Sequence, residues 1–188
     1  MSNYRIMLAA TLSLFLSGCV EKFDAADYQQ LADQYDVVIE RDHLGVPHII
    51  GERDVDAAFG FAYAQAEDNW QIIHDSIPFY RGTNGAVNGS DAAIVDFIIK
   101  WLGIWEDLDA GYETELKPET RAYIEAFADG INYYAALHPQ QTDKRLFPIN
   151  GKDIVAGYML RHLLFYGFDA PVRELYEEQR KYPISRGQ

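Results

Sequence analysis

One long helical pattern constrains the fold of this chain more than any other feature. Between residues 54 and 78, apolar side chains recur at steps of four, three, four, four, three and four residues. The positions are Val55, Phe59, Ala62, Ala66, Trp70, Ile73 and Ile77. Such spacing places one apolar stripe along an α-helix. Alanine and glycine crowd its first half, so we expect another element to pack closely there, and we expect Pro78 and Gly82 to end the helix.

The segments around this helix predict a hairpin followed by further helices. Residues 37–42 are rich in β-branched side chains, and residues 46–50 resume an extended course after a turn at 43–45. Further helices are predicted at residues 91–106, 118–138, 154–166 and 172–181, with Gly167 as a C-cap. Residues 81–90 form a Gly/Asn-rich loop in this interpretation. The fold class is therefore α+β, mostly helical, without a sheet large enough for a complete α/β domain.

The first 19 residues differ from the rest of the chain. Residues 6–16 form an apolar run of signal-peptide length, which is too short to span a bilayer comfortably. The sequence Leu-Ser-Gly-Cys at residues 16–19 resembles the bacterial lipobox. We therefore expect a lipoprotein signal peptide over residues 1–18, a lipid anchor on Cys19 and a polar tether over residues 19–36. The alternative is a plain secretory signal followed by a chance cysteine.

Export and charge limit the possible environments and partners. Cys19 is the only cysteine, so an intramolecular disulfide is impossible. Val20 stands where an aspartate would favour inner-membrane retention in known lipoproteins. That resemblance favours the outer membrane, with the protein facing the periplasm. The formal net charge of −13 argues against a nucleic-acid partner.

Residues 41–71 carry a set of motifs in fixed order and spacing. The first group is Arg41-Asp42, Gly45 and Pro47-His48-Ile49, and the second is Phe59-Gly60, Tyr63-Ala64, Ala66, Asp68 and Gln71. Together they resemble the start of the penicillin acylase family of N-terminal-nucleophile hydrolases. The stretch FGFAYAQAEDN at residues 59–69 is most similar to the branch of acyl-homoserine-lactone and lipopeptide acylases.

This resemblance implies an architecture in two chains. Residues 37–188 would be the alpha-chain portion of a four-layer αββα fold that a beta chain from the same precursor completes. The nucleophile would be the N-terminal serine of that beta chain, activated by its own α-amino group. We therefore expect no catalytic residue in this chain and no activity from it alone. Gly89-Ser90 is a poor candidate for the nucleophile, because the residues that follow it do not resemble a beta-chain start.

The resemblance also implies a reaction and a substrate class. The expected reaction is hydrolysis of the linear amide of an N-acylated small molecule. Acyl-homoserine lactones, acylated lipopeptides and β-lactam side chains are the candidate substrates, and no cofactor is required for the chemistry. The alternative is a non-catalytic lipoprotein, either a fragment or a binding module of the same fold.

Two sites in the last third of the chain follow from the family. A late alpha-chain helix lines the acyl pocket in relatives, and His162, Phe165 and Tyr166 share one face of the predicted fourth helix. The alternative is that these are ordinary core aromatics. Some relatives hold a structural calcium ion with one alpha-chain glutamate, for which Glu174 is the candidate and Glu177 and Asp169 are rivals. A solvated carboxylate is the alternative there.

Other polar residues are expected to be structural. The pairs Arg41-Asp42 and Glu67-Asp68 could suggest carboxylate chemistry, but in this family we expect them to be structural, either buried or paired with the beta chain. The five histidines show no metal-ligand spacing.

Overall fold

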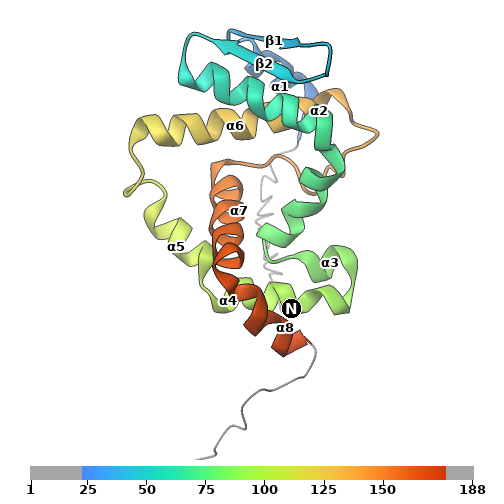
Figure 1. Ribbon diagram of the computed structural model, residues 1–188, viewed down its shortest axis with the longest axis vertical. Coiled ribbons are helices and arrows are strands. Elements are labelled where there is room, and N and C mark those ends of the chain that lie inside the picture. Colours follow the sequence, from blue (N-terminus) through green and yellow to red (C-terminus); the bar gives the residue numbers. More distant parts are fainter. Residues whose placement is uncertain (1–22, 177–188) are drawn as a thin grey trace, which may run out of the picture.

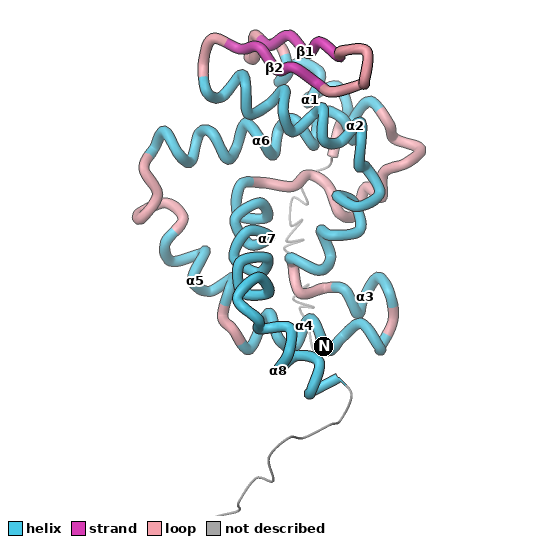
Figure 2. The backbone as a smooth tube through the Cα atoms, viewed as in Figure 1, coloured by secondary structure: helices cyan, strands magenta, loops and turns pink. Residues whose placement is uncertain are grey.

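The computed structural model describes residues 23–176, apart from some side chains of the last helix. The predicted signal peptide and Cys19 lie outside the described residues. A short helix, α1 (Ala25–Ala32), precedes an antiparallel hairpin of β1 (Val37–Arg41) and β2 (Pro47–Gly51). Helices make up most of the rest, as Figures 1 and 2 show. The predicted fold class, mostly helical with one short hairpin, is confirmed.

The helices follow the hairpin without another strand among the described residues. They are α2 (Asp54–Tyr80), α3 (Asn84–Asn88), α4 (Ala93–Trp101), α5 (Ile104–Gly111), α6 (Pro118–Leu137), α7 (Gly151–Leu163) and α8 (Asp169–Tyr176). A 3₁₀ turn (Ser90–Ala92) precedes α4, and a π-helical turn (Leu164–Phe168) joins α7 to α8. No helix in this part of the chain is long and apolar enough to cross a membrane.

The hairpin packs directly against the first half of α2 (Figure 1). A Cβ added at Gly60 would lie 2.5 Å from Val37 Cγ2 and 3.0 Å from Ile49 Cγ2, so only glycine permits this approach. The small residues predicted to admit a close neighbour therefore do so. Asp42 Oδ1 closes the hairpin turn by accepting hydrogen bonds from the backbone N–H groups of Leu44 and Val46, each at 2.9 Å.

Helix α2 is bent, which its sequence pattern did not predict. Asn69 has φ −139° and ψ 34°, and this kink directs the second half of the helix away from α6 and alongside α7 (Figure 1). The apolar stripe runs through the kink without interruption, so periodicity gives no sign of it. Of the two residues predicted to end the helix, Pro78 lies within the last turn, whereas Gly82 follows the C-cap Arg81 with a left-handed φ of 63°, as a helix-ending glycine does.

The helix predicted at residues 91–106 is also wrong as a single element. Gly103 adopts a left-handed conformation with φ 68°, which separates α4 from α5. The loop predicted at residues 81–90 contains α3. The Asp96 carboxylate stabilises α3 by accepting hydrogen bonds from the N–H groups of Asn84 and Gly85 at 2.7 and 2.8 Å.

Two apolar clusters hold the helices together. The first core cluster joins α2, α6 and the segment before α7, with Trp70, Ile77, Ile131 and Phe147 among its buried members. The second core cluster joins α4, α5 and α7, and its buried members are Ile99, Ile104, Leu108, Ala156 and Leu160. Helix α7 thus extends from beneath α6 to the opposite end of the molecule (Figure 1).

Candidate functional site

The first turn of α7 is fixed by a buried ion pair. The carboxylate of Asp153 accepts hydrogen bonds from Arg81 Nε at 2.7 Å and from Arg81 Nη2 at 2.8 Å. The same guanidinium donates to the carbonyl oxygens of Leu146 and Pro148 at 2.8 and 3.1 Å. The side chain of Asp153 is only 4% exposed. Because a buried charge requires a partner, this pair fixes the position of α7 relative to α2.

Helix capping reinforces the same turn. Asn150 Oδ1 accepts a hydrogen bond from the N–H of Lys152, while Asp153 Oδ2 accepts one from the N–H of Asn150, each at 3.0 Å. The carboxylate of Glu125, on α6, accepts from the Gly151 N–H at 2.8 Å and from the Tyr112 hydroxyl at 2.5 Å. Burial and this hydrogen bond raise the pKa of Tyr112 well above its usual value.

The last turn of α7 opens into the π-helical turn. The prediction that Gly167 is the C-cap of this helix is wrong, because Leu164 is the C-cap; Gly167, with φ 85°, lies within the π-helical turn. The chain then continues directly into α8 at Asp169, earlier than the predicted start of the fifth helix at residue 172. Single π turns occur frequently at functional sites, and here the turn carries aromatic side chains.

Four side chains at this end of α7 form an aromatic ladder, consisting of Tyr158, His162, Phe165 and Tyr166. The rings of Tyr158 and His162 stack with centroids 5.8 Å apart, and His162 contacts Tyr166 edge-on at 4.8 Å. Phe165 packs against Tyr166 at 5.6 Å. The structure thus brings together the three residues predicted for the acyl pocket and adds Tyr158.

The aromatic ladder is on the surface of this chain. Phe165 is 84% exposed and Tyr166 is 74% exposed. Among the described residues they are not core aromatics, so that alternative does not hold within this chain. Any cavity that they line must be closed by other residues, and their role as an acyl pocket stays a prediction.

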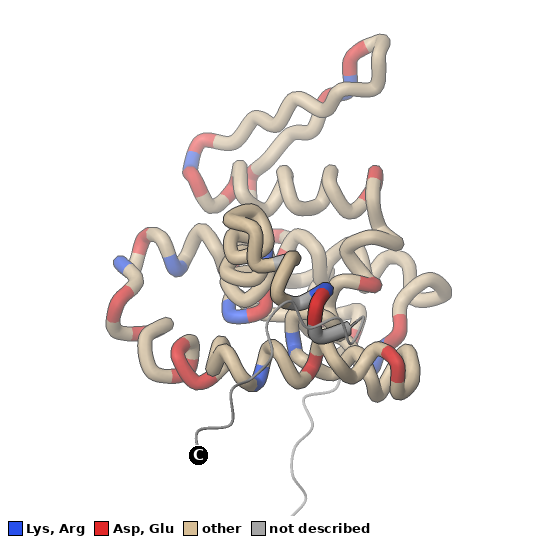
Figure 3. The backbone as a smooth tube through the Cα atoms, turned by 60° about the horizontal axis from the view of Figure 1, so that its bottom comes forward, with Lys and Arg blue, Asp and Glu red and all other residues tan. Residues whose placement is uncertain are grey.

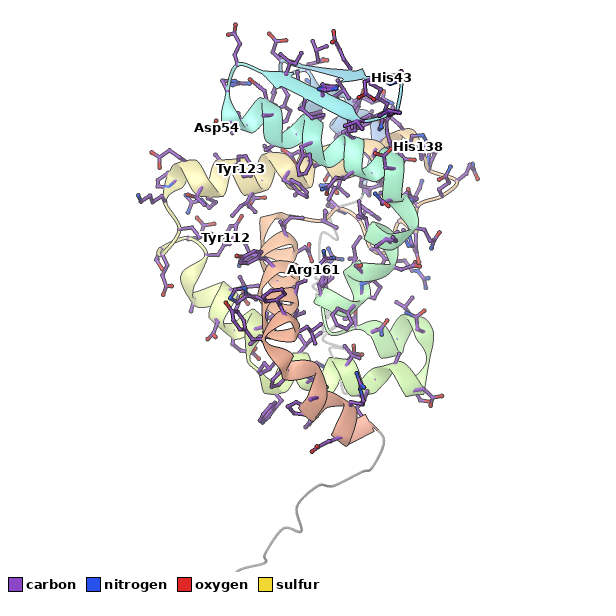
Figure 4. The ribbon with its side chains drawn as sticks, viewed as in Figure 1. His43, Asp54, Tyr112, Tyr123, His138 and Arg161 are labelled. Carbon is purple, nitrogen blue, oxygen red and sulfur yellow. The ribbon has the colours of Figure 1, made fainter. Side chains whose placement is uncertain are left out.

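A groove of about 300 Å³ lies beside the ladder, between α2, α6 and α7. Its walls are mainly isoleucines, with Ile72, Ile73 and Ile77 from α2, Ile131 from α6 and Ile154 from α7. Tyr158 borders both the groove and the ladder. Arg161 also lines the groove, and Figure 4 places it between α7 and the second half of α2. A groove of this size lies at the lower end of the usual range for small-molecule sites.

The calcium prediction stays a prediction. Glu174 is partly buried in α8, Glu177 lies outside the described residues, and the side chain of Asp169 is not described. Within residues 23–176, the described side chains contain no cluster of three or more His, Cys, Asp or Glu suited to a metal. Because calcium takes six to eight oxygen ligands, Glu174 would need most of its co-ligands from elsewhere.

Arg41 near the hairpin pairs with Glu67 and Asp68 of α2 within this chain, whereas burial or pairing with a beta chain was predicted. Arg41 Nη2 lies 2.9 Å from Glu67 Oε2 and 3.0 Å from Asp68 Oδ1. Hydrogen bonds to both carboxylates raise the pKa of Arg41, and the hydrogen bond to Glu67 has the larger effect. Arg41 Nη1 also donates to the carbonyl oxygen of Gly45 at 2.9 Å. The group ties the hairpin turn to α2, although its members are partly exposed rather than buried.

Sequence reasoning missed Tyr158, Arg161 and the pair of Arg81 with Asp153. Tyr158 precedes His162 by four residues, so the spacing that grouped the other ladder residues could have found it. No such signal identifies Arg161 or the ion pair, because Arg161 contacts Tyr80 and Arg81 contacts Asp153 across a long separation in the sequence.

Comparisons with known proteins agree on one family. A sequence profile described as penicillin amidase matches residues 36–166. Acyl-homoserine lactone acylase PvdQ from Pseudomonas fluorescens strain Pf0-1 is 30% identical over 111 residues, which cover 55% of this chain and 14% of that protein. Penicillin G acylase from Escherichia coli is 28% identical over 97 residues, covering 52% of this chain and 11% of that protein. The chain therefore spans a small part of the length of these relatives.

A solved structure supports the fold. A thermostable penicillin G acylase from Alcaligenes faecalis superimposes with a TM-score of 0.56 at 20% sequence identity. The match covers 81% of this chain and 95% of that chain. At this identity the likeness concerns the fold alone.

Proposed function

Because this chain belongs to the penicillin amidase family, we propose that it is the alpha-chain portion of an acylase that hydrolyses the linear amide of an N-acylated small molecule. The match over residues 36–166 is the observation that carries this proposal. Its relatives are acylases, and two kinds are named for acyl-homoserine lactones and for penicillin G. Acyl-homoserine lactones are our first candidate substrates, followed by acylated lipopeptides and β-lactam side chains.

In this proposal the reactive serine belongs to a beta chain from the same precursor. Among the described hydroxyl groups, Ser76 Oγ donates to the carbonyl oxygen of Ile72 at 2.6 Å, and Thr142 Oγ1 donates to that of His138 at 2.9 Å. These two hydroxyls thus have local backbone partners. The alpha chain would instead contribute the aromatic ladder as one wall of the acyl pocket.

We further propose that the mature protein is exported and lipid-anchored at Cys19, in the outer membrane facing the periplasm. The lipobox-like sequence at residues 16–19 supports this. Mass spectrometry of the native protein and of a Cys19→Ala variant would test it. We expect a diacylglycerol-bearing N-terminus that the variant lacks; an unmodified Cys19 would overturn the proposal.

Turnover by the complete mature protein tests the enzymatic function. We expect release of free amine from an octanoyl-homoserine lactone, and none from residues 19–188 alone. Phe165→Ala is expected to raise KM about fivefold, because roughly 1 kcal/mol of apolar contact with the acyl chain would be lost. Tyr123→Ala removes another exposed aromatic, on α6, and is the matched control (Figure 4). Absence of turnover by the complete protein would favour a non-catalytic binding module.

A further inference from the structure

The α7 wall of the groove is largely apolar between two charged residues, Asp153 in the first turn of the helix and Arg161 in its last turn. Isoleucines from α2, α6 and α7 form the walls of the groove, with Phe127 of α6 beside them. Two of its lining residues, Asp153 and Arg161, carry a formal charge. Their surroundings differ, and this difference indicates the kind of ligand that the groove can hold.

The charge of Asp153 is already compensated. Both of its carboxylate oxygens accept hydrogen bonds from Arg81, and Oδ2 also accepts from the N–H of Asn150. Arg161, in contrast, forms no ion pair with any described side chain. Its one side-chain hydrogen bond within residues 23–176 runs from Nη2 to the Tyr80 hydroxyl at 3.5 Å, the limit of such an interaction. The groove is therefore lined by a guanidinium whose donors are largely unused within this part of the chain.

Glycine lets α7 approach the Tyr80 ring closely near Arg161. A Cβ added at Gly157 would lie 2.7 Å from Tyr80 Cε2. Arg161, which is itself exposed, follows Gly157 by one helical turn and lies near the hydroxyl of the same ring. Tyr80 therefore lies beside both the apolar wall of the groove and Arg161.

We propose that this groove binds a medium-chain carboxylate, with the alkyl chain along the isoleucines and the carboxylate on Arg161. A guanidinium matches a carboxylate with two parallel hydrogen bonds, to which the Tyr80 hydroxyl can add a third. The volume of about 300 Å³ equals that of about ten water molecules in the liquid. Octanoate, with about ten non-hydrogen atoms, is of this size.

The excess of acidic residues in the chain means that an anion would bind here through Arg161 itself and not through a general positive charge. The chain has 29 acidic and 16 basic residues, and Figure 3 shows acidic positions spread along the backbone rather than gathered in one place. General attraction of anions is therefore excluded as a cause of binding. Under the proposed function, water adds to the amide carbonyl, the C–N bond breaks, and a carboxylate of this class leaves with the amine. That link to the product rests on the proposed function, whereas the binding itself does not.

Calorimetric titration of the full-length mature protein with sodium octanoate tests the proposal. We expect saturable binding that Arg161→Met weakens at least about tenfold, since a charge-assisted hydrogen bond is lost. Arg145→Met is the matched control, because Arg145 is 82% exposed and pairs with Asp143 away from the groove. Octylammonium has the same alkyl chain with the opposite charge and is expected not to bind.

Several results would overturn the proposal: no octanoate binding by the wild-type protein, unchanged binding by Arg161→Met, or equal loss in Arg161→Met and Arg145→Met. A partner segment that covers the groove would give the first of these results. Arg161→Lys keeps the charge, and its affinity for octanoate is expected to lie between that of Arg161→Met and that of the wild-type protein. This variant separates loss of charge from misfolding. Amide hydrolysis is assayed separately. If the protein hydrolyses amides and Arg161→Met binds octanoate as the wild-type protein does, the groove site is rejected and the proposed function is not.

Discussion

The first turn of α7 is enclosed by charged and polar partners, whereas the π-helical turn that follows its last turn carries rings that project from the surface. At the first turn, Asp153 pairs with Arg81 and Glu125 accepts a hydrogen bond from the N–H of Gly151. In the π-helical turn, Phe165 packs on Tyr166 and Tyr166 contacts His162, but both rings are mostly exposed. Helix α7 and the turn that follows it thus combine an end built for stability with an end free to meet a ligand or another chain.

The difference follows from what each end must satisfy. The backbone N–H groups at the start of a helix need acceptors, and burial there requires every one to be paired. Asn150, Asp153 and Glu125 supply these acceptors. The exposed rings at the other end have no backbone N–H groups to pair, and they remain accessible to a ligand or another chain. Substitutions should therefore affect stability strongly at the first turn and weakly in the π-helical turn.

The largest expected effect comes from Asp153→Ala. Removing this carboxylate leaves Arg81 partly buried without a counter-charge and also removes a helix cap, so we expect a loss of about 3 to 5 kcal/mol in the free energy of unfolding. Urea denaturation of the mature protein measures it. Lys152, the residue before Asp153, pairs with the exposed carboxylate of Asp109. Asp109→Ala removes that pair and should lower the free energy of unfolding by less than about 1 kcal/mol. Similar losses in the two variants would contradict the comparison.

A smaller, pH-dependent effect is expected at Tyr112. Its pKa is raised in the folded protein by burial and by its hydrogen bond to Glu125, so its hydroxyl ionises more readily in the unfolded chain. The stabilisation is present below the usual tyrosine pKa of about 10 and is lost as the pH rises above it. The protection factors of the first amides of α7, which allow for the general rise of exchange rates with pH, should fall above about pH 10 in the wild-type protein.

Tyr112→Phe should flatten this dependence, since the ionisable hydroxyl is gone. Tyr123→Phe removes a hydroxyl from an exposed ring on α6 and should leave the profile unchanged (Figure 4). An unaltered pH profile in Tyr112→Phe would assign the loosening of the first turn to another group.

Local patterns predicted the elements better than their interruptions. The β-branched residues at 37–39 predicted the hairpin, and Pro118 marked the start of α6, where its missing N–H costs nothing. The kink at Asn69 was missed because tertiary packing, not periodicity, decides it. The break at Gly103 depends on a left-handed φ that most glycines in helical segments do not adopt.

The same limit applies to the candidate site. The spacing of three and four residues grouped His162, Phe165 and Tyr166, because neighbours on one helix face are determined by the sequence alone. The groove is formed by three helices, and Arg81 reaches Asp153 across the fold. Such contacts depend on how the helices pack, which no local pattern encodes.

The smallest expected effect tests the other end of α7. Phe165 is 84% exposed, so Phe165→Ala should change the free energy of unfolding by less than about 0.5 kcal/mol in residues 19–188 alone. In the complete mature protein, where we propose that further residues close over the ladder, the same substitution should cost about 1 to 3 kcal/mol. Urea denaturation of both forms measures the difference. Equal small losses would mean that nothing covers Phe165, and the π-helical turn after α7 would then be an ordinary solvated helix end.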